Sequence, residues 1–138
     1  MSDVERAEAI VLEWRGSFTN AELAPLHAEG FGHAVSDADW VGQVERHSLG
    51  WVTARDRDRL VGFVNVAWDG GVHAFLLDTL VARTDRGRGI GTRLVAVAVE
   101  HAREAGCEWL HVDWDADLRR FYVDACGFVP TEAGLIAL

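Results

Sequence analysis

The residues best suited to chemistry lie in segment 81–92, which reads Val-Ala-Arg-Thr-Asp-Arg-Gly-Arg-Gly-Ile-Gly-Thr. Glycines alternate from Gly87 to Gly91, and glycine lets a backbone take unusual dihedral angles and lets a ligand approach closely. A helix is expected to begin here, and the free N–H groups and dipole of a helix start attract anions. Arg86 and Arg88 add positive charge. The segment therefore predicts a phosphate or pyrophosphate site; the alternative is a surface turn that binds nothing.

Two common phosphate-binding patterns are absent from this loop. The dinucleotide pattern G-x-G-x-x-G fails, because the third glycine is missing whether counted from Gly87 or from Gly89. The P-loop pattern fails because it needs a lysine and all 13 basic residues are arginine. The lack of lysine also excludes Schiff-base enzymes. The remaining pattern is Arg-x-x-Gly-x-Gly, formed by Arg86, Gly89 and Gly91.

Two single residues on either side of the loop are candidates for acid–base work. Asp78 interrupts a segment that is otherwise mostly apolar from Ala74 to Ala82, so its carboxylate must be paired, solvated in a cleft or functional. Tyr122 is the one tyrosine of the chain. Its ring either packs a short helix against the sheet or presents its hydroxyl to a ligand.

A third group, His111, Asp113 and Asp115, falls on one face of a predicted strand. Three ligands from a single strand do not converge well, so we expect no metal site. The alternatives are an acidic wall that attracts a cationic amine and a solvated face.

Composition sets the class of protein. The 138 residues carry 13 basic and 22 acidic side chains, a net charge of −9, which disfavours nucleic-acid binding. No membrane-spanning run or signal peptide is evident. The 2 cysteines do not form a disulfide framework. We therefore expect one cytoplasmic domain over residues 1–138, with no membrane partner.

The first half of the chain is expected to form most of an antiparallel sheet. Turns at 56–58 and 69–71 separate apolar runs, as in hairpins. Thr19 and Glu22 have the spacing of a capping box, which predicts a helix start. The expected elements are a strand over Ala9–Arg15, helices from Thr19 to about Glu29 and from Ser36 to about His47, and strands over Leu49–Arg55, Leu60–Trp68 and Val72–Ala82.

The second half is expected to contain a strand–helix–strand unit with a right-handed parallel crossover. Its elements are a helix over Gly91–Ala105, a strand over Trp109–Trp114, a short helix over Leu118–Cys126, and final strand material at Phe128 and Leu135–Leu138. The fold class is α+β, with a mixed, mostly antiparallel sheet flanked by helices and a C-terminal βαβ unit. The apolar end, Leu135–Leu138, predicts either a buried strand or a surface that a second copy covers in a homodimer.

Two segments in this arrangement resemble those of a known family. Asp78-Thr79-Leu80-Val81 and the glycine loop resemble the acetyl-CoA signature of the GCN5-related N-acetyltransferase (GNAT) superfamily. Phe121-Tyr122-Val123-Asp124-Ala125-Cys126-Gly127-Phe128 resembles the Phe-Tyr-x-x-x-Gly-Phe element of that family. The resemblance implies a GNAT-like fold and an acetyl-CoA-dependent N-acyltransferase whose acceptor is a small-molecule or protein amine.

The resemblance also implies residue roles. Tyr122 would protonate the departing thiolate, and Asp78 would take the amine's proton, directly or through water. The pantetheine arm would pair with the backbone of Leu80, Val81 and Ala82, whose N–H groups would stabilise the oxyanion. The pyrophosphate would lie on the backbone of the glycine loop, here Arg86, Gly87, Arg88, Gly89, Ile90, Gly91 and Thr92.

The sequence departs from the family pattern just before the Phe-Tyr pair. Asp115 stands where relatives often have asparagine, and an ionised carboxylate can accept but not donate a hydrogen bond to CoA. An alternative function is a catalytically inactive CoA-binding sensor or interaction module of the same fold. A third is an unrelated nucleotide-binding protein, which rests on the glycine loop alone.

Overall fold

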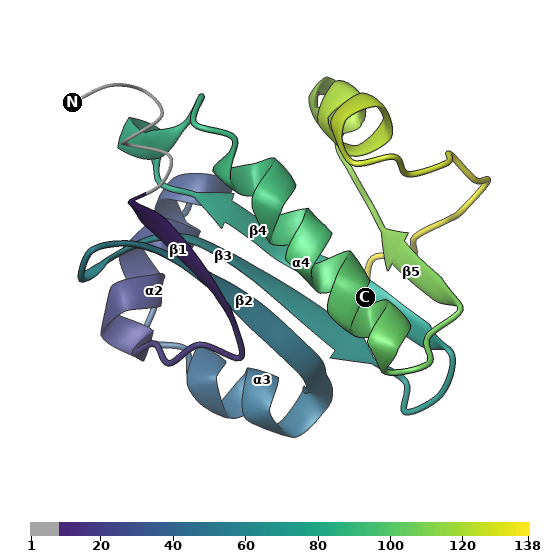
Figure 1. Cartoon of the computed structure of the whole chain (residues 1–138), viewed down its shortest axis with the longest axis horizontal. Helices are drawn as coiled ribbons and strands as arrows, with labels where there is room; N and C mark the ends of the chain where they lie inside the picture. The colour runs from purple at the N-terminus through teal and green to yellow at the C-terminus, as the bar shows by residue number, and fades with distance from the viewer. Residues whose placement is uncertain (1–8) are drawn as a thin grey trace.

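A computed structural model describes residues 9–138 and shows a five-stranded sheet with helices on both faces (Figure 1). The strand order follows the sequence; neighbours are antiparallel except β4 and β5, which are parallel and joined through α4. The elements are β1 (Ile10–Trp14), α2 (Asn20–Phe31), α3 (Trp40–His47), β2 (Ser48–Asp56), β3 (Arg59–Trp68), β4 (His73–Val81), η1 (Arg83–Asp85), α4 (Ile90–Glu104), β5 (Trp109–Val112), η2 (Ala116–Leu118) and η3 (Arg120–Ala125).

Helices α2 and α3 bury one apolar cluster against the sheet. The predicted capping box is confirmed, because Thr19 and Glu22 each accept a hydrogen bond from the other's backbone N–H. Helix α3 begins at Trp40, later than the predicted start at Ser36, because the Asp39 carboxylate caps its first turn. The cluster comprises Phe18, Leu23, Ala24, Leu26, Trp40, Val44, Trp51, Leu60, Phe63 and Leu80.

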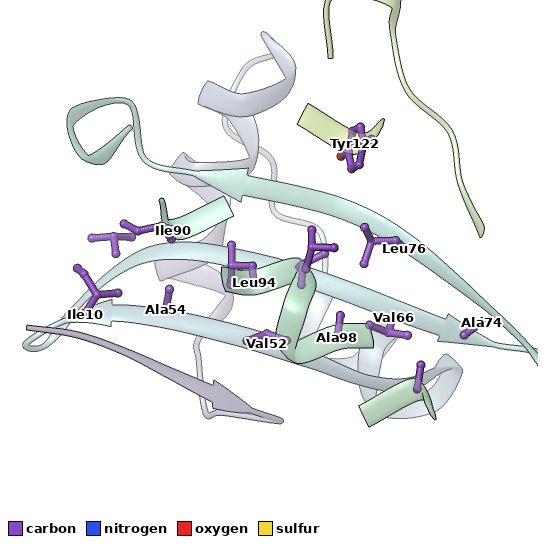
Figure 2. Packing of buried hydrophobic residues seen from close by; sticks show 14 residues of the cluster. Ile10, Val52, Ala54, Val66, Ala74, Leu76, Ile90, Leu94, Ala98 and Tyr122 are labelled. Atoms are coloured by element: carbon purple, nitrogen blue, oxygen red, sulfur yellow. The ribbon is translucent and has the colours of Figure 1, made fainter. Parts of the chain in front are cut away.

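Helix α4 covers the other face of the sheet with an apolar stripe. Ile90, Leu94 and Ala98 are almost fully buried against the strands, and Tyr122 lies at the edge of this cluster beside β4 (Figure 2). The cluster comprises Ile10, Val52, Ala54, Val61, Val64, Val66, Ala74, Leu76, Ile90, Leu94, Val95, Ala98, Ala102 and Tyr122.

A β-bulge interrupts β4 at Asp78. Asn65 pairs with Leu77 and Phe63 pairs with Leu80, so two residues of β4 lie opposite one residue of β3. Asp78 has a φ of 54°, which an L residue rarely adopts outside such irregularities. Because side chains alternate along a strand, the extra residue reverses which face the following side chains point to.

Strands β4 and β5 pair only over their first four residues. The register runs from His73 opposite Trp109 to Leu76 opposite Val112, so the pairing ends two residues before Asp78. Among the described residues, the second half of β4 therefore has β3 on one side and no strand on the other.

The α+β prediction is confirmed, but the predicted last strand is wrong. The described chain beyond Ala125 contains no helix or strand. Phe128 instead contacts the Tyr122 ring edge-on, with 5.9 Å between ring centroids, and Pro130 lacks the N–H that a strand ladder requires. The side chains of Leu135 and Ile136 are exposed. No helix within residues 9–138 is both long and apolar enough to cross a membrane.

Candidate functional site

The glycine loop connects η1 to α4 with the backbone geometry that the sequence predicted. Gly87 and Gly89 have φ values of 81° and 74°, and a Cβ built on either would meet no atom within 4 Å. Gly89 is the N-cap of α4 and supplies no side chain to the first N–H groups of the helix. Those groups have no carbonyl partner within their own helix, so the loop can hold an anion against exposed backbone.

A buried carboxylate fixes the base of the loop. Asp85 is only 3% exposed at its side chain. It accepts two hydrogen bonds from Arg59, at 2.8 and 3.1 Å, and one from Arg88 at 2.8 Å. Arg88 also bonds Asp56 at 3.2 Å. The guanidinium of Arg88 thus ties the loop to the β2–β3 turn, whereas the Arg86 side chain is exposed.

The hydrogen bonds around Asp85 set its protonation. Burial raises the pKa of Asp85, but the bonds from the two arginines and Thr84 outweigh burial and hold this pKa below its usual range. Asp85 is therefore an ionised structural anchor at neutral pH.

The two segments that resemble the GNAT family lie against each other. A Cβ at Gly91 would stand 3.1 Å from the Phe121 ring, so this glycine permits close contact between α4 and η3. The chain has four residues between Tyr122 and Gly127, one more than the family element quoted above. The structure accommodates the extra residue as a π-helical turn, in which the Cys126 N–H donates to the Phe121 carbonyl at 3.0 Å.

Tyr122 is held among aromatic rings beside the bulge of β4. Its ring stacks on Trp114 at 5.8 Å between centroids, and the Thr79 side chain lies near its hydroxyl. Burial raises the pKa of Tyr122, and the Thr79 side chain only partly offsets this. The hydroxyl is therefore protonated at neutral pH and able to donate.

Asp78 lies on the opposite side of β4 and faces a residue that the sequence did not single out. His27 of α2 places its Nε2 atom 3.6 Å from an Asp78 carboxylate oxygen. Burial raises the pKa of Asp78, and His27 opposes that rise. The two residues are far apart in the sequence, and no spacing pattern connects them; only the packing of α2 on β4 brings them together.

The backbone between Asp78 and the loop has a free edge. The Ala82 N–H donates to the Val61 carbonyl on β3 at 2.8 Å. Because successive residues of a strand point their N–H groups to opposite sides, the N–H of Val81 points away from β3. The edge that faces the gap between β4 and β5 therefore offers a backbone donor and acceptor at Val81.

A groove of about 270 Å³ lies between α4 and η3. It starts at Thr92, at the end of the glycine loop, and reaches Cys126. Its lining is Thr92, Val95, Ala96, Val99, Glu100, Arg103, Ala125 and Cys126.

His111, Asp113 and Asp115, which the sequence placed on one strand face, do not form a single cluster. His111 pairs with His73, with 2.7 Å between ring nitrogens, and stacks on Phe75. Asp113 and Asp115 follow the end of the strand and are exposed. The Asp115 carbonyl accepts the Leu118 N–H at 2.8 Å, which begins η2.

The sequence profile of the Acetyltransferase (GNAT) family matches residues 8–128, and the chain belongs to this family. A probable glucosamine 6-phosphate N-acetyltransferase from Oryza sativa subsp. japonica is 43% identical over 60 residues, which are 44% of this chain and 36% of that protein. The matched part thus spans about a third of that relative's length.

Solved structures show the same fold. A probable acetyltransferase from meticillin-resistant Staphylococcus aureus has a TM-score of 0.77 at 22% identity, covering 94% of this chain and 98% of that one. The structure of AAC(6')-Iy in complex with a bisubstrate analogue, CoA-S-monomethyl-acetylneamine, has a TM-score of 0.74 at 17% identity, covering 94% and 97%.

The Asp85 anchor predicts a defined loss of stability. Asp85→Asn removes the charge that Arg88 and Arg59 share, and we expect the free energy of unfolding to fall by about 1–3 kcal/mol. Because folding lowers the pKa of Asp85, its contribution is complete above the unfolded pKa of about 3.9 and is lost as pH falls below that value.

Urea unfolding at pH 7 and at pH 4 to 3 measures both effects. The difference between wild type and Asp85→Asn should be largest at pH 7 and shrink in acid. Asp58→Asn, in the adjacent exposed turn, is the control and should change stability little. Equal stability of the wild type and Asp85→Asn at pH 7 would contradict the anchor role.

Proposed function

We propose that this member of the GNAT family is an N-acetyltransferase that transfers the acetyl group of acetyl-CoA to an amine by direct attack in a ternary complex. The observation that carries the proposal is the free edge of β4 at Leu80–Ala82, which lies between the glycine loop and Tyr122. The backbone edge of β4, the glycine loop and the Tyr122 side chain thus lie next to one another.

The residues present fit CoA. Open space at Gly87 and Gly89 leaves room for a pyrophosphate on the backbone of residues 86–92. The Val81 carbonyl at this edge can accept a hydrogen bond from an amide N–H of a pantetheine arm, as an added strand would. Acetyl-CoA supplies the activated acetyl thioester. The Val81 N–H is placed to stabilise negative charge on the thioester oxygen.

The acid and base roles fall to the two side chains beside the bulge. Tyr122, protonated at neutral pH, donates its proton to the departing thiolate. Asp78 accepts the proton that the amine nitrogen loses when it bonds to the acyl carbon. Cys107 and Cys126 both have pKa values raised by burial, which disfavours a thiolate nucleophile and a covalent acyl-enzyme.

The acceptor class follows from charge. The chain carries a net charge of −9, and Asp113 and Asp115 are exposed beyond β5. These features favour a small cationic amine over an anionic acceptor. The neighbour AAC(6')-Iy was solved with an acetylneamine analogue, whereas the relative from Oryza sativa is named for an amino sugar that carries an anionic phosphate. The two names share an amino sugar as acceptor. A panel of amines, screened for release of CoA thiol, tests the class; release without any amine dependence would contradict transfer.

The glycine loop gives the first prediction about acetyl-CoA. Acetyl-CoA should raise the Tm of the wild type, because a ligand that binds only the folded state stabilises it. Gly89→Val forces a β-branched residue to a φ of 74° and should abolish the shift. Gly70→Val is the matched control: Gly70 also has a positive φ, 81°, with open space around it, but lies in the β3–β4 turn.

Both variants should lose about 1–2 kcal/mol of stability from backbone strain. Only Gly89→Val should lose the acetyl-CoA shift in a thermal-melt assay. An absent shift in the wild type at millimolar acetyl-CoA would refute the cosubstrate assignment, and equal shifts in both variants would refute the loop's role.

Tyr122→Phe tests the proton donor. The thiolate of CoA is a moderate leaving group, so an acid helps without being indispensable, and kcat should fall about 10- to 1000-fold. The ring packing on Trp114 is kept, so Tm and the affinity for acetyl-CoA should change little. Because the chain has no second tyrosine, none can replace it. An unchanged kcat where chemistry limits turnover would rule out this role, and a loss confined to acetyl-CoA affinity would make the hydroxyl a binding group.

The exposed C-terminal side chains carry the prediction of a homodimer. Val129, Leu135 and Ile136 are 80%, 83% and 87% exposed, and association would remove this apolar surface from water. Light scattering should then give twice the 15.2 kDa of one chain, and Ile136→Ser should shift the protein towards the monomer. A mass of one chain for the wild type would refute the dimer.

A further inference from the structure

A chain of hydrogen-bonding groups runs from Asp78 to the protein surface through two histidines. His27 Nε2 is 3.6 Å from an Asp78 carboxylate oxygen, and His27 Nδ1 is 2.7 Å from His33 Nε2. His33 Nδ1 is in turn within hydrogen-bond distance of the Ala34 carbonyl oxygen. Asp78 and His27 are partly buried, whereas His33 is exposed.

The Ala34 carbonyl fixes where the protons sit along this chain. A carbonyl oxygen can only accept, so His33 Nδ1 must carry a proton. The neutral His33 ring then has a bare Nε2, so the proton between the two rings belongs to His27 Nδ1. A neutral His27 therefore presents a bare Nε2 to Asp78.

A bare nitrogen and a carboxylate cannot bond to each other, since both are acceptors. The contact becomes favourable only when one proton lies between them, either on His27 Nε2 or on the Asp78 carboxyl. The rings of Phe31 and Trp40 pack around His27, 4.7 and 5.0 Å away from centroid to centroid.

We propose that Asp78 and His27 act as one proton-accepting pair for the incoming amine, held in a single tautomer by His33 and the carbonyl of Ala34. This inference rests on the proposed acetyltransfer. In it, His27 receives the amine's proton from Asp78. His33 is a positioning residue.

The step balances as follows. The nitrogen lone pair forms the N–C bond to the acyl carbon, and the N–H bond breaks towards an Asp78 oxygen. The proton passes from Asp78 to the bare Nε2 of His27, which becomes an imidazolium beside a restored carboxylate. The C–S bond breaks, and the sulfur takes the proton of Tyr122. Before the next cycle the pair must lose its shared proton and the Tyr122 phenolate must regain one.

Two titratable groups face His27 in the described contacts. They are Asp78 from β4 and His33 from the segment after α2; α3 contributes the Trp40 ring, and α2 itself contributes Phe31. Of these side chains only Asp78 carries a negative charge, so no second carboxylate among these contacts takes part in the pair.

The tautomer can be read without any turnover. Nitrogen-15 NMR of the full chain at a pH where the histidines are neutral should show His27 protonated on Nδ1 and bare on Nε2. His33→Ala removes the acceptor for Nδ1–H, and His27 should then turn to the Nε2-protonated form, which can donate to the Asp78 carboxylate. A wild-type His27 protonated on Nε2, or no change in His33→Ala, would overturn the proposal.

The kinetic arm uses His27→Gln, which keeps a polar side chain but cannot take a proton. We expect kcat/KM for the amine to fall about 10- to 100-fold at neutral pH, with the KM for acetyl-CoA unchanged. The rise of activity with pH should move to lower pH, because the wild type must free a proton shared by two accepting groups, Asp78 and His27, whereas the variant must free Asp78 alone. His101→Gln is the control: His101 stacks on Trp14 and should leave kcat/KM and its pH profile unchanged.

The outcomes separate the two claims. Amine-dependent CoA release with an unchanged pH profile in His27→Gln would overturn the pair and leave acetyltransfer standing. No CoA release by the wild type with any amine would refute the proposed function, and the NMR tautomer would still decide whether the pair exists. A lower Tm shared by His27→Gln and Asp78→Asn, without a change in the pH profile, would show a structural contact only and also overturn the proposal.

Discussion

The bulge at Asp78 is the constraint on which the site depends. A regular β4 would continue its alternation past Leu76, and Leu80 would then face α4. The extra residue reverses the alternation, so Leu76 packs in the cluster under α4 while Leu80 packs in the cluster under α2. One strand therefore joins two cores, and its pairing with β5 ends just before the reversal. The free edge of β4 follows from this reversal of the side-chain alternation.

The glycine loop depends on a second, electrostatic constraint. A glycine-rich turn has high conformational entropy, and a pyrophosphate site needs its N–H groups to converge. The buried Asp85 carboxylate and the guanidinium of Arg88 anchor the loop just before Gly89, and Asp56 links the anchor to the β2–β3 turn. An arginine in a predicted binding motif therefore need not contact the ligand: the Arg88 side chain stabilises the fold, whereas that of Arg86 is exposed.

The sequence predicted most of the elements because local signals were strong. Thr19 and Glu22 marked one helix start, and the apolar stripe from Leu94 to Ala102 marked another helix. Prediction from the sequence failed where the structure depends on contacts between residues distant in the chain. The C-terminal apolar residues have the composition of a strand, but Phe128 is held against Tyr122 and the chain is led away from β5. His27 had no motif at all, because its partner Asp78 is reached only through the packing of α2 on β4.

Two adjacent residues at the bulge serve opposite faces of the sheet. Asp78 points towards α2 and contacts His27, whereas Thr79 reaches Tyr122 at the edge of the cluster under α4. The proposed proton acceptor and the proposed proton donor thus lie on opposite faces of the sheet, on either side of one backbone edge. An amine that approaches from the Asp78 side and a thiol that departs on the Tyr122 side would meet only at the Val81 edge. The geometry therefore suits transfer across β4 in a single complex better than a path through an enzyme nucleophile, for which neither cysteine is activated.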